Sequence, residues 1–130
     1  MSISPCQLRS HLRYNLAGTV FLALFGAVYE HFSHGVYSWF MLCAFTVPLF
    51  LGVIPYTLLL IQGRDPGRAA VTAWSSGIAA LSFGSVLQGV LEIYGTTNAL
   101  IAVYPIVGGT LLIFGALFAL HSIRKTNLEK

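Results

Sequence analysis

Apolar residues form four long runs along the chain, and short polar stretches separate them. The runs cover residues 12–34, 36–61, 69–94 and 99–120. At ~1.5 Å per residue, helices of these lengths reach across a hydrocarbon core of roughly 30 Å. We therefore predict an all-α, polytopic membrane protein, whose residues 1–130 form a single domain built as a bundle of four transmembrane helices.

The first run carries polar residues near both of its ends. The stretch from Leu16 to Tyr29 has no strongly polar side chain, but it gives only about 21 Å of helix, which is shorter than the core. We therefore expect the helix to continue past Glu30 as far as His34, with Gly35 ending it. Glu30 then lies about one turn inside the helix end.

Prolines and turn residues mark the interruptions in the pattern. Pro48 and Pro55 lie inside the second run and should kink it, with neighbouring helices satisfying the freed carbonyls. Residues 62–68 combine two glycines, a proline and charged side chains, which predicts a turn. Asn98 is expected to cap the fourth helix.

The composition fits a bilayer and gives no sign of catalysis. The chain is 56% hydrophobic and 8% charged, whereas soluble proteins carry roughly 25% charged residues. Cys6 and Cys43 have no metal-binding spacing. The sequence contains no phosphate-binding loop, no Ser–His–Asp arrangement and no His-Glu-x-x-His motif. We expect a protein that is not an enzyme and that does not bind nucleic acid.

The basic residues lie only in the two terminal segments and in the turn at 62–68. The turns near 31–36 and 93–98 contain no Lys or Arg. The positive-inside rule then places both termini in the cytoplasm and the other two turns outside, and we expect the membrane to be the plasma membrane. The seven residues are Arg9, Arg13, Arg64, Arg68, Arg124, Lys125 and Lys130.

The two halves of the chain share a weak pattern that suggests a parallel repeat of two hairpins. At an offset of 58, the Phe-Gly-x-Val sequence of residues 25–28 recurs at residues 83–86. In a second match, a proline is followed four residues later by a glycine at residues 48–52 and again at residues 105–109, which is an offset of 57. Two copies of two spans each would be parallel in the membrane. The alternative is chance matching among glycine-rich helices.

Polar residues gather near the outer ends of the first and third runs. The offset of 58 aligns Glu30 and His34 with Gln88 and Glu92, and each pair has the i,i+4 spacing that shares a helix face. A carboxylate and an imidazole in this arrangement bind cations or hold a polar ligand. We predict that these four residues form an outward-facing site between the first and third helices, for a small solute or cation that the protein binds or translocates.

Two other interpretations of these positions stay open. Glu30, His31 and His34 are candidate metal ligands, although a metal site uses three or four ligands and one helix offers two at best. Alternatively, the groups only reach headgroups and water at the helix end, which costs little.

A stripe of polar residues follows one face of the third helix. Ser75, Ser82, Ser85 and Glu92 recur at steps of seven, three and seven. One interpretation is helix packing, since hydroxyls hydrogen-bond between membrane helices. The other is a polar path that ends at the glutamates.

Two further functions are compatible with the sequence. The protein could be a non-catalytic accessory subunit of a larger membrane complex, or a homo-oligomer, with Gly108, Gly115 and Ala119 forming a small-residue face for the partner. It could also be a haem-binding electron-transfer subunit, for which His11 and His121 would be the candidate ligands. The sequence assigns no cofactor.

Overall fold

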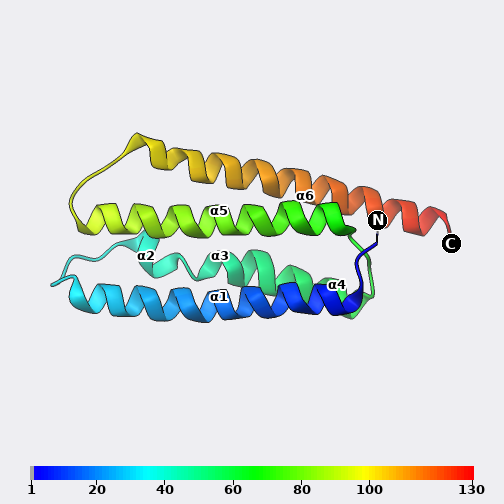
Figure 1. Ribbon diagram of the computed structural model, residues 1–130, viewed down its shortest axis with the longest axis horizontal. Helices are drawn as coiled ribbons and strands as arrows, with labels where there is room; N and C mark the ends of the chain where they lie inside the picture. Colours follow the sequence, from blue (N-terminus) through cyan, green and yellow to red (C-terminus); the bar gives the residue numbers. More distant parts are fainter. Residues whose placement is uncertain (1) are drawn as a thin grey trace.

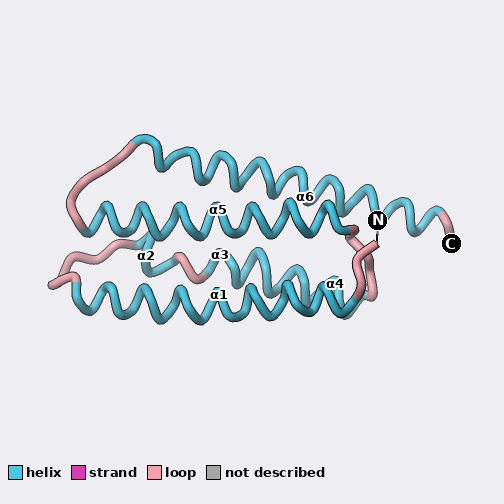
Figure 2. Tube along the Cα trace, viewed as in Figure 1, coloured by secondary structure: helices cyan, strands magenta, loops and turns pink. Residues whose placement is uncertain are grey.

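Helices run side by side in the computed structural model, which describes residues 2–130 (Figure 1). The segments α2 to α4 together form one span, and η2 with α6 forms another (Figure 2). The described residues thus contain four segments that are long and apolar enough to cross a membrane, which confirms the predicted all-α fold of four membrane helices. In chain order the elements are α1 (Pro5–Phe32), α2 (Trp39–Cys43), α3 (Thr46–Pro48), the π-helical turn η1 (Leu49–Val53), α4 (Ile54–Gln62), α5 (Arg68–Ile93), the 3-10 turn η2 (Ala99–Ala102) and α6 (Val103–Leu128).

The α5 helix lies in the middle of the arrangement. It packs against the pieces of the second span on one side and against α6 on the other, while α1 packs against the second span (Figure 1). Both termini and the loop at 63–67 lie at one end of the molecule, and the loops at 33–38 and 94–98 lie at the other. We call the first the basic end, because it carries every Lys and Arg, and the second the acidic end, because it carries Glu30 and Glu92.

The first helix begins seven residues before the predicted start at residue 12, at Pro5. Ser4 and Gln7 form a capping box there, which satisfies backbone N–H groups at the helix start. The Gln7 N–H donates to Ser4 Oγ at 3.2 Å, and the Ser4 N–H donates to Gln7 Oε1 at 3.3 Å. The polar N-terminal residues are therefore part of the helix and not a tail.

The first helix ends at Phe32, two residues before the predicted end. Both the backbone N–H and the hydroxyl of Ser33 donate to the Glu30 carbonyl, at 3.2 and 2.7 Å. His34 then takes a left-handed φ of 58°, and Gly35 has a φ of 91°. Because His34 has left the helix, the prediction that it shares a helix face with Glu30 is wrong.

The second span is broken near Pro48, and its helix starts at Trp39 instead of residue 36. Pro48 has no N–H to donate to the Ala44 carbonyl, so the regular helical pattern cannot continue. The Val47 N–H donates to that carbonyl instead, at 3.4 Å. At the position of the predicted kink, the regular α-helical hydrogen-bonding pattern is therefore interrupted between α2 and α4.

The neighbouring α5 supplies donors to this broken span. Pro55 cannot donate to the Leu51 carbonyl, and the Trp74 indole N–H donates to it at 2.6 Å. The Ser85 hydroxyl donates at 2.8 Å to the carbonyl of Phe40, the second residue of α2. The expectation that a neighbouring helix satisfies the freed carbonyls is confirmed for Pro55, whereas the carbonyl freed by Pro48 is satisfied within the second span.

The last two helices match their predicted starts. The α5 helix begins at Arg68, within one residue of the prediction, and Asn98 caps the final span by accepting the Leu100 N–H at 2.9 Å. The final helix continues to Leu128 instead of residue 120, because the polar C-terminal residues extend it beyond the apolar run.

Glycines allow α5 and α6 to approach closely. A Cβ atom on Gly77 would lie 2.9 Å from the Gly108 carbonyl oxygen, and one on Gly115 would lie 2.9 Å from the Trp74 backbone nitrogen. Gly108 and Gly115, which the sequence offered as a face for a partner, are therefore used inside the chain. Ala119, the third residue of that face, lines a groove between α4, α5 and α6.

Candidate functional site

The loop from residue 33 to residue 38 returns the chain to the side of α1. The left-handed residues His34 and Gly35 reverse its direction. Ser38 then caps α2, with its Oγ accepting the Met41 N–H at 3.4 Å. This short return places Ser38 against the last turn of the helix that carries Glu30.

Glu30 and Glu92 both hydrogen-bond to Ser38. The Ser38 N–H donates to Glu30 Oε1 at 2.9 Å, and the Ser38 hydroxyl donates to Glu92 Oε2 at 2.6 Å. Ser38 is only 1% exposed and Glu30 is 7% exposed, while Glu92 is half-buried. The two carboxylates therefore converge on one buried serine, and we call these three residues the carboxylate site.

One oxygen of the carboxylate site lacks a partner within residues 2–130. Glu30 Oε2 is buried and makes no hydrogen bond to any described residue. Burying a carboxylate oxygen without a donor or a cation is costly, and such atoms are rare in folded proteins. The described residues therefore leave this carboxylate oxygen buried without a hydrogen-bond donor.

Gln88 supports the site through Glu92. Its Nε2 donates to Glu92 Oε1 at 3.4 Å, as the i,i+4 spacing on α5 allows. Of the four predicted ligand-binding residues, the structure thus brings Glu30, Gln88 and Glu92 together.

Two glycines hold α2 between α1 and α5 beside the carboxylate site. A Cβ atom on Gly26 would lie 3.1 Å from the Met41 carbonyl oxygen, and one on Gly89 would lie 2.8 Å from Met41 Cβ. Met41 is 1% exposed. This close packing fixes Ser38 between the two helices that carry the glutamates.

The histidines at this end lie apart from the carboxylate site. His31 and His34 are both exposed, and His34 Nδ1 lies 2.8 Å from the Phe32 carbonyl oxygen. Residues 2–130 contain no group of three or more His, Cys, Asp or Glu side chains that could hold a metal ion. The structure therefore does not support the combination of Glu30, His31 and His34 as a metal site, because the chain turns away at the end of α1.

A second polar cluster lies nearer the basic end, and sequence reasoning missed it. The Tyr56 hydroxyl and Ser75 Oγ are 2.6 Å apart, and Ser75 Oγ lies 3.3 Å from His11 Nδ1. The rings of His11 and Tyr56 also pack, with centroids 5.9 Å apart. Tyr56 lies in an apolar run that contains no charged residue, so the signals for this cluster were His11 and the serine stripe.

The serine stripe serves mainly to join helices. Ser75 bonds to the second span through Tyr56, and Ser85 bonds to it through the Phe40 carbonyl. Ser82 differs, because its Oγ is buried without a hydrogen-bond partner among the described residues. Helix packing accounts for Ser75 and Ser85, as one of the two interpretations predicted.

The two histidines considered as haem ligands lie on separate helices. His11 contacts Ser75 from α1, whereas His121 is exposed on α6. The α5 helix lies between α1 and α6 (Figure 1). This placement does not favour a shared iron.

Comparisons with known proteins give no family for this chain. No protein-family model matches it, and neither the curated proteins nor the solved structures provide a match.

Proposed function

We propose that this protein is an integral membrane protein that binds a small cation at the carboxylate site and translocates it. The observation that supports the proposal is the convergence of Glu30 and Glu92 on Ser38. The free Glu30 Oε2 supplies a ligand atom that no described residue uses.

Charge supports a cation over an anion or a neutral solute. Two carboxylates that bond to the same buried serine repel each other strongly where water is scarce. The Ser38 donors offset part of this repulsion, and every Lys and Arg lies at the opposite end of the molecule. A bound cation, of which the proton is the smallest example, offsets the remaining repulsion between the carboxylates.

The charge distribution also supports an orientation. With the basic end in the cytoplasm, the carboxylate site lies near the outer face of the membrane. Exposed aromatic residues surround it, as is typical of an interface with lipid headgroups; they include Phe32, Tyr37, Trp39 and Tyr94. We propose the plasma membrane, with both termini cytoplasmic.

A groove between α1 and α5 supports a route for translocation. It has a volume of about 290 Å³ and is lined in part by His11, Asn15, Ser75 and Ser82. The groove reaches Leu22 on α1 and Ser82 on α5, about two to three helical turns short of Glu30 and Glu92. A cation that left the carboxylate site toward the basic end would cross this segment before it met the Ser82 hydroxyl and the cluster around Ser75.

Electrical recording on proteoliposomes adsorbed to a solid-supported membrane tests this proposal. The probes are concentration steps of Na⁺, K⁺, methylammonium or H⁺. We expect a charge displacement for at least one probe with the wild type, and its loss with Glu30→Gln and with Glu92→Gln. Glu129→Gln is the matched control, because Glu129 is an exposed acidic residue at the basic end. A wild type silent to all four probes, or a signal that survives both substitutions, would overturn the proposal.

A role as an accessory subunit or a homo-oligomer is the second candidate, and α6 favours it. This helix packs mainly against α5 and exposes a large apolar surface. Its exposed side chains include Val103, Ile106, Ile113, Phe114, Leu117 and Phe118. Purification in mild detergent tests this candidate, since recovery of only a monomer without a membrane-protein partner would contradict it.

A further inference from the structure

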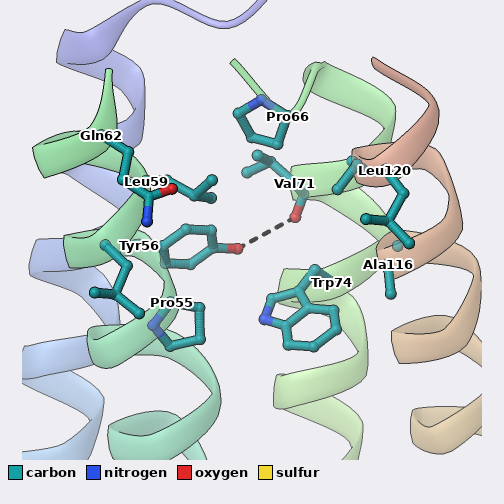
Figure 3. Close-up of a pocket in the computed structure, with 13 residues that line it drawn as sticks. Pro55, Tyr56, Leu59, Gln62, Pro66, Val71, Trp74, Ala116 and Leu120 are labelled. Carbon is teal, nitrogen blue, oxygen red and sulfur yellow. Dashed lines mark hydrogen bonds between the residues drawn. The ribbon is translucent and has the colours of Figure 1, made fainter. Parts of the chain in front are cut away.

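An open groove lies between α4, α5 and α6, close to the basic end (Figure 3). Its volume is about 400 Å³. On α4 it extends from Pro55 to Gln62, which corresponds to about 10 Å along the helix. Its walls are almost entirely apolar and include Leu59, Val71, Trp74, Ala116 and Leu120.

The groove is built into the packing of the helices. Gly115 brings α6 against Trp74, and the small side chain of Ala116 leaves space beside it. Trp74 is held in place by its hydrogen bond to the Leu51 carbonyl. The groove is therefore a fixed apolar surface and is separate from the carboxylate site at the other end.

Two arginines lie about one helical turn beyond lining residues, toward the end of the groove that carries Gln62 and Pro66. Arg68 lies three residues before Val71 on α5, and Arg124 lies four residues after Leu120 on α6, so each shares a helix face with a lining residue. Both arginines are exposed.

Asp65, the acidic residue of the loop between α4 and α5, accepts hydrogen bonds from backbone N–H groups. Its carboxylate accepts the N–H of Ile3 at 3.1 Å and the N–H of Gly67 at 2.8 Å. Its carbonyl oxygen accepts the Ser122 hydroxyl at 3.2 Å, which ties the loop to α6. Within residues 2–130, the hydrogen bonds of Asp65 thus come from groups other than the arginines.

We propose that this groove binds an anionic phospholipid, with an acyl chain along the apolar walls and the phosphate at Arg68 and Arg124. The apolar walls surround a hydrocarbon chain with the same kind of environment as the bilayer core. Guanidinium groups bind phosphate through paired hydrogen bonds. Basic pockets between membrane helices are typical sites for phosphorylated headgroups.

Native mass spectrometry of the detergent-purified protein tests the headgroup contacts. The probes are phosphatidylglycerol and phosphatidylcholine with identical acyl chains. We expect tighter binding of phosphatidylglycerol, and a loss of about five-fold in that preference for each of Arg68→Gln and Arg124→Gln. Arg9→Gln is the matched control, because Arg9 lies at the same end on α1, which does not line the groove. An unchanged preference in both variants, or an equal loss with Arg9→Gln, would overturn the proposal.

Filling the groove tests the position of the acyl chain. Ala116→Phe should weaken the binding of both lipids, whereas Ile113→Phe, on an exposed part of α6 outside the groove, should not. If Ala116→Phe leaves lipid binding unchanged, or if it dissociates a dimer instead, the groove does not hold a lipid.

Discussion

At the scale of single residues, Ser38 connects the parts of the carboxylate site. Its backbone N–H bonds to Glu30, and its hydroxyl donates to Glu92 while accepting the Met41 N–H. A hydroxyl has one donor and two acceptor positions, so one small side chain suffices for both of its roles. Sequence reasoning selected the two glutamates but not this serine, which lies inside the second predicted run at residues 36–61.

Replacing Ser38 should weaken both the fold and the site. Ser38→Ala removes the α2 cap and the bond to Glu92, and we expect a loss of about 1 kcal/mol in the free energy of unfolding. The affinity for the probe cation should fall about ten-fold, which corresponds to ~1.4 kcal/mol. Thermal unfolding in detergent and equilibrium binding measure the two effects. Ser76→Ala, at an exposed position of α5, should change neither, and equal losses in both variants would contradict the role of Ser38.

At the scale of helices, α5 compensates for the prolines of the second span. The sequence predicted the kinks from Pro48 and Pro55 alone, because the missing N–H is a property of proline itself. It could not predict that Trp74 would satisfy the carbonyl freed by Pro55, since Trp74 reaches the Leu51 carbonyl only after α5 has packed against the second span. The start of α1 is a different case, because the capping box of Ser4 and Gln7 is a local pattern, which sequence reasoning missed.

The hydrogen bond from Trp74 should contribute measurably to stability. Trp74→Phe keeps an aromatic ring but leaves the Leu51 carbonyl without its donor, at a cost of about 1–3 kcal/mol. Trp39→Phe is the matched control, because Trp39 is 79% exposed. In a Pro55→Ala background the restored N–H can bond to Leu51, and Trp74→Phe should then cost less. Thermal unfolding of the four variants measures this difference, and equal costs in both backgrounds would contradict the assignment.

Substitutions at two glycines, one in the contact between α2 and α5 and one in open space on α6, should have opposite effects on stability. Gly89→Ala places a Cβ 2.8 Å from that of Met41, so we expect it to destabilise the protein by about 1–3 kcal/mol and to weaken cation binding. Gly109→Ala meets no atom within 4 Å and should stabilise α6 by up to about 1 kcal/mol. We expect the melting temperature of Gly89→Ala to lie below that of the wild type and the melting temperature of Gly109→Ala to lie above it. A stabilising Gly89→Ala would show that α2 is not held as described.

At the scale of the whole molecule, the number of membrane helices and the grouping of charges were predictable from the sequence. Both depend on the order of apolar and charged residues along the chain, which needs no knowledge of packing. The candidate site was predictable only in part: Glu30, Gln88 and Glu92 meet, whereas His34 does not, because the helix ends at Phe32. The second cluster and the groove at the basic end depend on contacts between distant segments, which no local pattern reveals.

The proposed orientation is testable by cysteine labelling. In a Cys6→Ser, Cys43→Ser background, Thr97→Cys places a thiol in the loop at the acidic end, and Lys130→Cys places one at the basic end. A membrane-impermeant maleimide applied to intact cells should label the first and not the second. Labelling of Lys130→Cys alone would reverse the orientation and place the carboxylate site on the cytoplasmic side.

We propose that Glu30 and Glu92 form one cation site through Ser38. Isothermal titration with the responsive probe cation tests it most directly, on the wild type, Glu30→Gln, Glu92→Gln and the double variant. Groups that share one site have non-additive effects. We predict that each single substitution lowers the affinity at least ten-fold and that the double variant is no worse than the weaker single variant. Affinity losses that add in the double variant, or a wild-type affinity in either single variant, would contradict the claim.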